Sequence, residues 1–214
     1  VRRAMFAAIY DILRFEKTDA FTREVFDLAI QSVTDPAESW WVKDSALRLI
    51  GHGPADWVEP HLETLLPFLE HDDWWLQNAT LTALTPVVAD ERCYEKVLPP
   101  IGELIRTNQR SALTLGLMGS IRAKIKAGPP AVHQLATETL RETYTQYAGV
   151  ETAPGGQDIS STLDSHMKSI AASLADLPGG LDVLYTIARA RYPQETLPYK
   201  EYFLKAKPAQ LGPE

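Results

Sequence analysis

Three groups of residues in this chain of 214 residues have side chains that can do chemistry. His71, Asp72 and Asp73 offer an imidazole and two carboxylates, which are donors that hold zinc or manganese. Cys93 follows Arg92 near an expected helix start, and both a nearby cation and a helix start lower the pKa of a thiol. Five basic side chains follow with no acid between them, and such a run is able to contact phosphates: Arg106, Arg110, Arg122, Lys124 and Lys126.

Local structure explains the first two groups more simply. No second cluster with ligand spacing accompanies His71, and an aspartate before a helix normally accepts a hydrogen bond from the first turn. We therefore predict no metal ligands here, and we expect Cys93 to be an idle structural thiol. The other four histidines are scattered, and we expect each to be a surface or partly buried residue: His52, His61, His133 and His166.

Sequence motifs of catalysis and cofactor binding are missing from the chain. It has no Gly-x-Ser-x-Gly nucleophile motif, no phosphate-binding Gly-x-x-x-x-Gly-Lys-Ser/Thr motif, no dinucleotide-binding Gly-x-Gly-x-x-Gly motif and no His-Glu-x-x-His zinc motif. We therefore predict that the protein is not an enzyme, with no catalytic residues and no cofactor.

Helices must position all of these residues, because apolar side chains recur with helical spacing along nearly the whole chain and alternating strand-like patterns are scarce. The predicted helices cover residues 1–15, 21–33, 38–50, 58–70, 73–88, 94–106, 109–126, 130–147, 161–175 and 181–191. The first eight form four helical hairpins. Residues 149–157, rich in glycine, read as a linker, and the tail from Tyr192, with four prolines, reads as a partly ordered cap.

Two doubled tryptophans, Trp40-Trp41 and Trp74-Trp75, begin two of these helices. Each pair opens an apolar stretch of similar pattern and follows turn residues that are acidic or include proline. Self-similarity at a spacing such as the one from Trp40 to Trp74 is typical of a repeat protein. Both helices have two apolar faces, so we expect a hairpin partner to cover one face and the next repeat to cover the other.

These repeats resemble the HEAT family in its bacterial form, most clearly over residues 35–106. The resemblance implies an all-α fold, a right-handed α-solenoid of stacked antiparallel helical hairpins over residues 1–147, followed by a linker and a C-terminal helical cap over residues 148–214. It also implies a scaffolding or binding role. The family's Val-Arg, small-residue and Ala-Leu positions are filled by Val42-Lys43, Ser45-Ala46 and Leu49-Ile50 in one repeat, and by Leu76-Gln77, Ala79-Thr80 and Ala83-Leu84 in the next.

Charge is unevenly distributed in this acidic chain, which has a formal net charge of −7 and a pI near 5.3. Residues 35–90 hold ten acids and two bases, whereas residues 91–147 hold five acids and eight bases. An acidic protein is a poor generic binder of nucleic acid or of anionic membranes. No run of residues is long and apolar enough to span a bilayer, so we also predict no membrane insertion.

The compartment is left open by the sequence. Cys93 is the only cysteine, which rules out an internal disulfide, and no signal peptide is visible. The chain begins at Val1, inside a predicted helix and without an initiator methionine, so we expect it to be part of a longer protein.

The favoured function is a non-catalytic HEAT-like scaffold or protein-protein interaction module of a larger bacterial protein, with a protein or peptide of unknown identity as partner. The tryptophans either fill the seam between repeats and cover a loop, or present Trp41 and Trp75 as an aromatic strip. Two alternatives remain: a HEAT-like nucleic-acid-binding protein or DNA glycosylase, and a structural or regulatory spacer. The predicted interaction surface consists of Trp41, Trp75, Arg106, Arg110, Arg122, Lys124 and Lys126.

Overall fold

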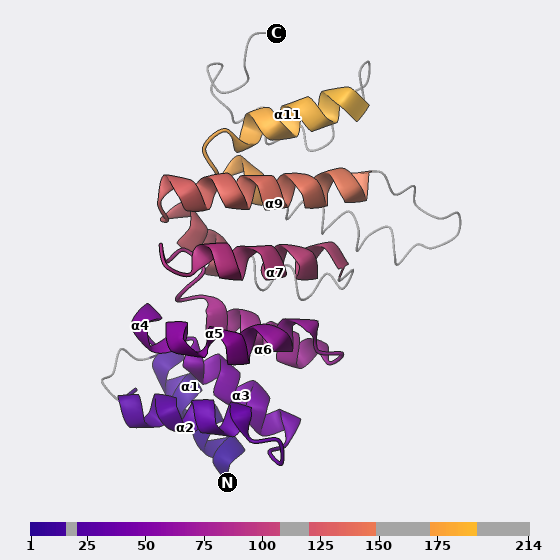
Figure 1. Cartoon of the computed structure of the whole chain (residues 1–214). Helices are drawn as coiled ribbons and strands as arrows, with labels where there is room; N and C mark the ends of the chain where they lie inside the picture. The colour runs from indigo at the N-terminus through magenta and orange to yellow at the C-terminus, as the bar shows by residue number, and fades with distance from the viewer. Residues whose placement is uncertain (16–20, 108–119, 149–171, 192–214) are drawn as a thin grey trace. The chain divides into compact units, whose positions relative to one another are not determined.

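The computed structural model describes residues 1–15, 21–107, 120–148 and 172–191, and within these ranges the backbone forms helices and turns and no strand (Figure 1). The predicted all-α class is therefore confirmed. The chain divides into two compact units, Val1–Ile101 and Gly102–Glu214, and the division falls inside one helix, α7 (Tyr94–Thr107). The predicted domain boundary between residues 147 and 148 stays a prediction, because it adjoins residues outside the described ranges.

The first unit is built around four helices: α1 (Arg2–Phe15), α2 (Arg23–Thr34), α3 (Trp40–Ile50) and α6 (Trp74–Leu84). Helix α3 occupies a central place, since it packs against α1, α2 and α6. Apolar side chains at helical spacing build the core in α2, α3 and α6, whereas in α1 Phe6 is buried and Met5 and Ile12 are exposed. The fully buried large side chains of this unit include Phe6, Phe26, Leu47, Leu49, Ile50, Leu76, Leu81 and Leu84.

The segment between α3 and α6 differs from the single predicted helix over residues 58–70. It begins at Ala55 and consists of four short pieces: α4 (Ala55–Val58), the 3-10 turn η1 (Glu59–His61), α5 (Leu62–Leu65) and the 3-10 turn η2 (Leu66–Glu70). Because the segment starts early, Pro60 falls in its interior and not in its first turn. Pro60 and Pro67 each lack the amide hydrogen that an α-helix needs, and a 3-10 turn forms at each.

Helices α3 and α6 pack directly against each other, and we call this contact the α3–α6 seam. Leu47 in α3 and Leu81 in α6 occupy the same position of their repeats, and both are fully buried. Val42 and Ala46 on the other face of α3 are buried as well. Helix α3 is thus covered by α6 and by α1 and α2, whereas the segment that follows it, expected as its hairpin partner, packs mainly against α6.

Gly51 ends α3 for a reason that the sequence did not indicate. Gly51 has a right-handed backbone with φ of −62°, so no left-handed conformation requires a glycine there. A glycine is required at this position because a β-carbon there would overlap the backbone carbonyl oxygen of Thr82 in α6. The missing side chain lets the end of α3 approach the backbone of the next tryptophan helix.

Helix α6 ends at Leu84, two residues before Pro86, and is shorter than the helix predicted over residues 73–88, because proline lacks the amide hydrogen that continues a helix. A turn region then leads to α7, and Val87, Val88 and Cys93 in that region are buried. Helix α7 belongs to the first unit up to Ile101 and to the second unit from Gly102 onward.

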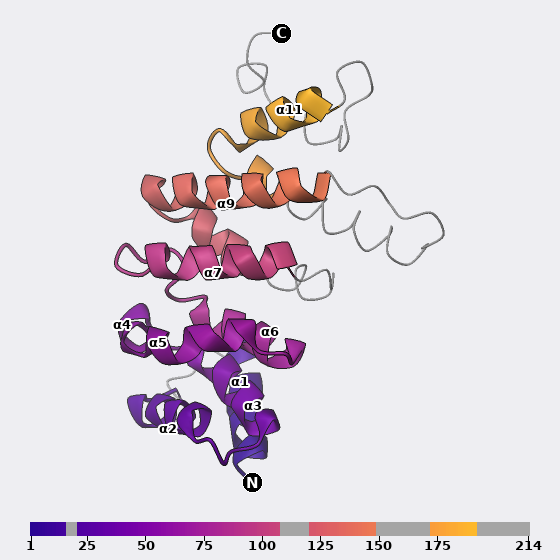
Figure 2. The same ribbon diagram turned by 45° about the vertical axis from the view of Figure 1, so that its right-hand side comes forward.

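The second unit contains α9 (Pro130–Ala148), α11 (Gly180–Arg191) and helical residues at 120–126 and 172–175. Helix α11 packs against α9, and the two lie side by side in both views (Figures 1 and 2). The described parts agree with the predicted helices at 109–126, 130–147, 161–175 and 181–191. The remaining parts of those predictions, like the predicted linker and tail, lie outside the described residues.

Candidate functional site

The two tryptophan pairs adopt the same arrangement at the starts of α3 and α6. The rings of Trp40 and Trp41 are stacked with centroids 3.6 Å apart and planes 26° apart, and those of Trp74 and Trp75 are stacked at 3.9 Å and 27°. The two rings of each pair therefore lie together, and the assignment of one ring to the seam and the other to a loop stays a prediction. Adjacent helical residues diverge by about 100° at the backbone, but the long side chains turn back and lie face to face.

In each pair the outer ring is more exposed than the inner ring. Trp41 is 46% exposed and Trp75 is 43% exposed, whereas Trp40 and Trp74 are half-buried beneath them. Trp41 and Trp75 lie on neighbouring helices that pack together through the α3–α6 seam. Both are exposed tryptophans on packed helices, so together they form a candidate interaction site.

Two arginines of α1 approach the first tryptophan pair. The guanidinium of Arg3 lies over the ring of Trp41, 4.5 Å from its centroid, and Arg2 donates a hydrogen bond to Glu38 at 2.9 Å. Glu38 immediately precedes the cap residue of α3, so the acid and the exposed ring lie close together in sequence. A cation–π contact thus holds Arg3 and an ion pair holds Arg2, both at the start of α3.

The second pair follows His71, Asp72 and Asp73, whose side chains could in principle bind a metal ion. The Asp73 carboxylate accepts a hydrogen bond from the Trp75 amide at 2.9 Å, and His71 Nδ1 accepts one from the Asp73 amide at 2.9 Å. Gln77 donates to the carbonyl oxygen of His71 at 2.7 Å. The predicted capping role of the aspartate is confirmed, and in the described part of the chain no three potential metal-binding side chains cluster together.

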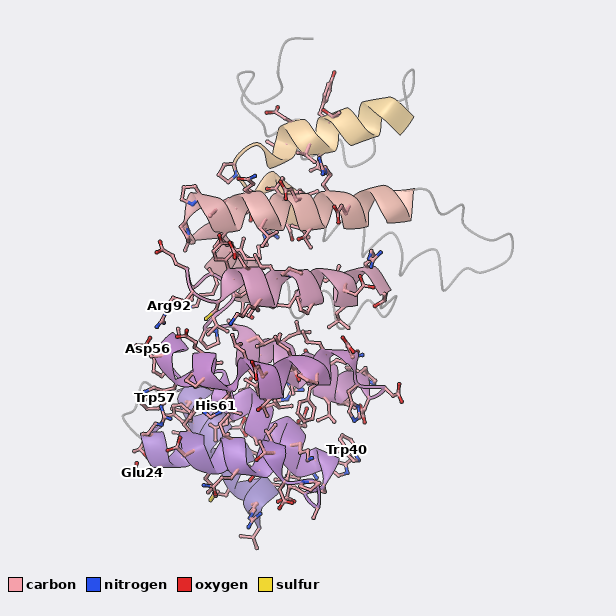
Figure 3. The ribbon with its side chains drawn as sticks, in the orientation of Figure 1. Glu24, Trp40, Asp56, Trp57, His61 and Arg92 are labelled. Atoms are coloured by element: carbon pink, nitrogen blue, oxygen red, sulfur yellow. The ribbon has the colours of Figure 1, made fainter. Side chains whose placement is uncertain are left out.

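Arg92 lies at the opposite end of the first unit from Trp40 (Figure 3), and its guanidinium pairs with three carboxylates. It lies 2.6 Å from Asp56, 2.9 Å from Glu59 and 3.0 Å from Asp90. The hydrogen bond from Arg92 holds the pKa of the Asp90 carboxyl below its ordinary value. Sequence reasoning missed this cluster, because Asp56 and Arg92 are 36 residues apart and nothing local links them. The cluster ties the turn before α7 to the start of α4, which is a structural role.

Cys93 is fully buried beside this cluster. Burial raises the pKa of its thiol to about 11, and the carboxylates of Asp90 and Glu59 act in the same direction. The lowering effect of Arg92 is smaller than these combined effects. The thiol is therefore not activated by its basic neighbour, as expected for an idle structural cysteine.

Aromatic rings and two imidazoles gather near α2 and α4. The Phe26 ring is fully buried and lies edge-on to Trp57, with centroids 5.5 Å apart, and the His61 ring lies 5.9 Å from Phe26. The Arg23 guanidinium covers both Phe26 and Trp57 at 5.3 Å. Partial burial lowers the pKa of His61, and the charge of Arg23 adds to this effect while Asp27 opposes it.

His52 extends the same cluster toward α1. Its ring lies edge-on to Tyr10 at 5.3 Å and to Phe21 at 6.4 Å, and desolvation lowers the pKa of the imidazole. The sequence predicted surface or partly buried histidines, and His52 and His61 agree with that, whereas His166 lies outside the described residues. The gathering of His52 and His61 into one cluster had no local signal, because it also draws residues from α1 and α2.

The predicted basic residues fall in or near the second unit, and acids accompany most of those described. Arg106 pairs with Glu103 in α7. Arg122 lies 2.5 Å from Asp176, and Lys126 lies 3.8 Å from the same carboxylate. Lys124 is exposed. Arg110 lies outside the described residues. The sequence showed no acid inside the basic run, but the fold brings Asp176 to it from 54 residues away.

Comparisons with known proteins assign no family, since no protein-family model, no curated protein and no solved structure matches the chain. Within the described residues, no helix has the length and apolar character required to cross a membrane.

Proposed function

We propose that this chain is a non-catalytic interaction module built from HEAT-like repeats, which binds a protein or peptide partner through Trp41 and Trp75. The observation that supports it most strongly is the exposure of these two rings, 46% and 43%, at equivalent positions on neighbouring helices. In this proposal the stacked hairpins form a right-handed α-solenoid over residues 1–147, and the chain is part of a larger bacterial protein. The repeat places Trp41 and Trp75 at equivalent positions of successive hairpins.

The exposed rings are large enough to contribute substantially to binding. Burying the exposed part of one indole removes on the order of 100 Å² of apolar surface from water, which contributes about 2 kcal/mol before the costs of association. Aromatic anchors of this kind carry much of the binding energy at protein interfaces. Each outer ring also rests on its stacked neighbour, so little side-chain freedom is lost when a partner covers it.

A peptide-library selection tests this proposal. Random peptides displayed on phage are selected on the purified chain, and the affinity of each selected peptide is measured by fluorescence anisotropy. We expect peptides that bind the chain and that lose at least about tenfold in affinity to the double variant Trp41→Ala/Trp75→Ala.

The matched control is Glu24→Gln, an exposed substitution near the end of the unit opposite Trp40 (Figure 3). It should leave peptide affinity unchanged, and circular dichroism should show equal helix content in all variants. Selected peptides that bind the double variant as tightly as the unaltered chain would refute the proposed site.

A further inference from the structure

The first tryptophan pair already holds a ligand-like group supplied by the chain itself. Arg3 stacks on Trp41 at 4.5 Å while Arg2, the preceding residue, pairs with Glu38 at 2.9 Å. Trp41 and Glu38 therefore bind two adjacent arginines at the same time. Guanidinium groups are well suited to both contacts, since they are planar and weakly hydrated.

The second repeat carries the same two recognition groups in the same register. Trp75 stands one repeat after Trp41, and Asp72 stands at the same spacing after Glu38. The supporting stack is also repeated, because Trp74 lies under Trp75 at 3.9 Å as Trp40 lies under Trp41 at 3.6 Å.

The second copy differs from the first in lacking an arginine partner. Among the described residues, no cation lies over the Trp75 ring and no base pairs with Asp72. Both side chains are exposed, and Glu70 adds a further exposed carboxylate close by in sequence. These acids offset the positive end of α6, which would otherwise disfavour a cation.

We infer that Trp75 and Asp72 form a binding site for two adjacent arginines of a partner peptide, a second copy of the site that Arg2 and Arg3 fill within the chain. The inference rests on the proposed function and specifies its partner as an arginine-bearing segment. The guanidinium of one arginine stacks on Trp75, and that of its neighbour pairs with Asp72. The charge of residues 35–90, ten acids against two bases, favours the approach of such a partner.

The test is a titration of the ¹⁵N-labelled chain with acetyl-Arg-Arg-amide, followed through the indole N–H signals of the five tryptophans. The Trp75 signal is assigned with Trp75→Phe. We expect a saturable shift of the Trp75 signal, with the Trp41 signal less affected because Arg3 already occupies that ring. Acetyl-Lys-Lys-amide should bind about threefold more weakly, and the uncharged citrulline dipeptide should produce no saturable shift.

Two variants separate specific recognition from general attraction to an acidic surface. Asp72→Asn should weaken binding of the arginine dipeptide by about threefold, whereas Glu63→Gln, which removes another exposed carboxylate, should not. The double variant Arg2→Ala/Arg3→Ala should free the first site, so that the Trp41 signal now shifts with the dipeptide as well.

Three results would overturn the inference. One is the absence of a Trp75 shift, and another is an equal shift with the citrulline dipeptide. The third is a shift of the Trp75 signal that increases with protein concentration in the absence of peptide. That result would mean that the N-terminus of a second copy of the chain occupies the site. If selected peptides without arginine bind through Trp41 and Trp75, this inference fails while the proposed function stands. If selection also yields no peptide, both fail.

Discussion

Gly51 lies so close to the backbone carbonyl of Thr82 that a β-carbon at Gly51 would overlap the carbonyl oxygen. The contact joins the end of α3 to α6, and it involves backbone that cannot swing away as a side chain would. The α3–α6 seam therefore depends on a residue with no side chain at this position.

Gly51→Ala should destabilise the first unit by about 1–3 kcal/mol, because the added methyl group forces the two helices apart. Alanine is otherwise the better helix former, so the local backbone preference alone predicts a gain. Urea unfolding followed by circular dichroism measures the change. Ser39→Ala, an exposed change at the other end of α3, is the control. A Gly51→Ala variant as stable as the control would mean that the seam is looser than described.

Helices α3 and α6 were predictable because their apolar spacing matches the faces that the fold buries, as Leu47 and Leu81 show. The break over residues 55–70 was not predictable in the same way. The cost of a proline depends on where its helix begins, and the start at Ala55 moved Pro60 from a tolerated position into the interior. Likewise, the role of Gly51 depends on Thr82 in another helix, and no local pattern reveals it.

The two tryptophan helices begin with caps that differ, and this difference should appear in stability. Asp73 accepts a hydrogen bond from the Trp75 amide, whereas Ser39, its counterpart in the preceding repeat, makes no side-chain cap bond. Asp73→Ala should therefore cost about 1 kcal/mol, and Ser39→Ala should cost less than about 0.5 kcal/mol. Equal costs in chemical unfolding would contradict the assigned roles.

Acidification should weaken the first unit through its two clustered histidines. Partial burial lowers the pKa of His61 and His52, so the unfolded chain binds more protons than the folded chain as the pH falls below the ordinary value of 6.5. Stability should decline from about pH 7.5 to pH 5, before the Asp90 carboxyl begins to protonate.

The histidine origin of this decline is tested with His52→Gln/His61→Gln. The double variant should unfold with a midpoint that depends less on pH over the same range, even if its absolute stability is lower. Arg23 favours the neutral form of His61 and Asp27 opposes it, so Asp27→Asn should make the decline at acid pH steeper. A pH dependence that is unchanged in the double histidine variant would contradict this explanation.

The thiol of Cys93 should react slowly in the folded protein. Its side chain is fully buried and its pKa is raised to about 11, so little thiolate exists near neutral pH. Mass spectrometry after treatment with iodoacetamide should show strong protection in the folded chain and rapid, complete labelling in denaturant. Equal labelling rates in both states would place the thiol at the surface and overturn the arrangement around Arg92.

The candidate site was only partly readable from the sequence. Residue types and the repeat pointed to Trp41 and Trp75. Helical spacing predicts the direction in which a side chain leaves the backbone, but it does not predict that two large neighbouring rings turn toward each other and stack. The contact of Arg3 with Trp41 depends on how α1 packs on α3, which no local motif encodes. The pairing of Arg122 with Asp176 also joins distant segments, so the basic run looked less neutralised in sequence than it is in the fold.

Oxidative footprinting of the tryptophans most directly tests the central claim that Trp41 and Trp75 contact a partner. Hydroxyl radicals oxidise exposed indoles, and mass spectrometry reports the rate at each residue with and without a saturating selected peptide. The account predicts strong protection of Trp41, Trp75 or both, and an unchanged rate at Trp57, which lies at the opposite end of the first unit from Trp40 (Figure 3). Unchanged oxidation of both outer rings in the complex would contradict it.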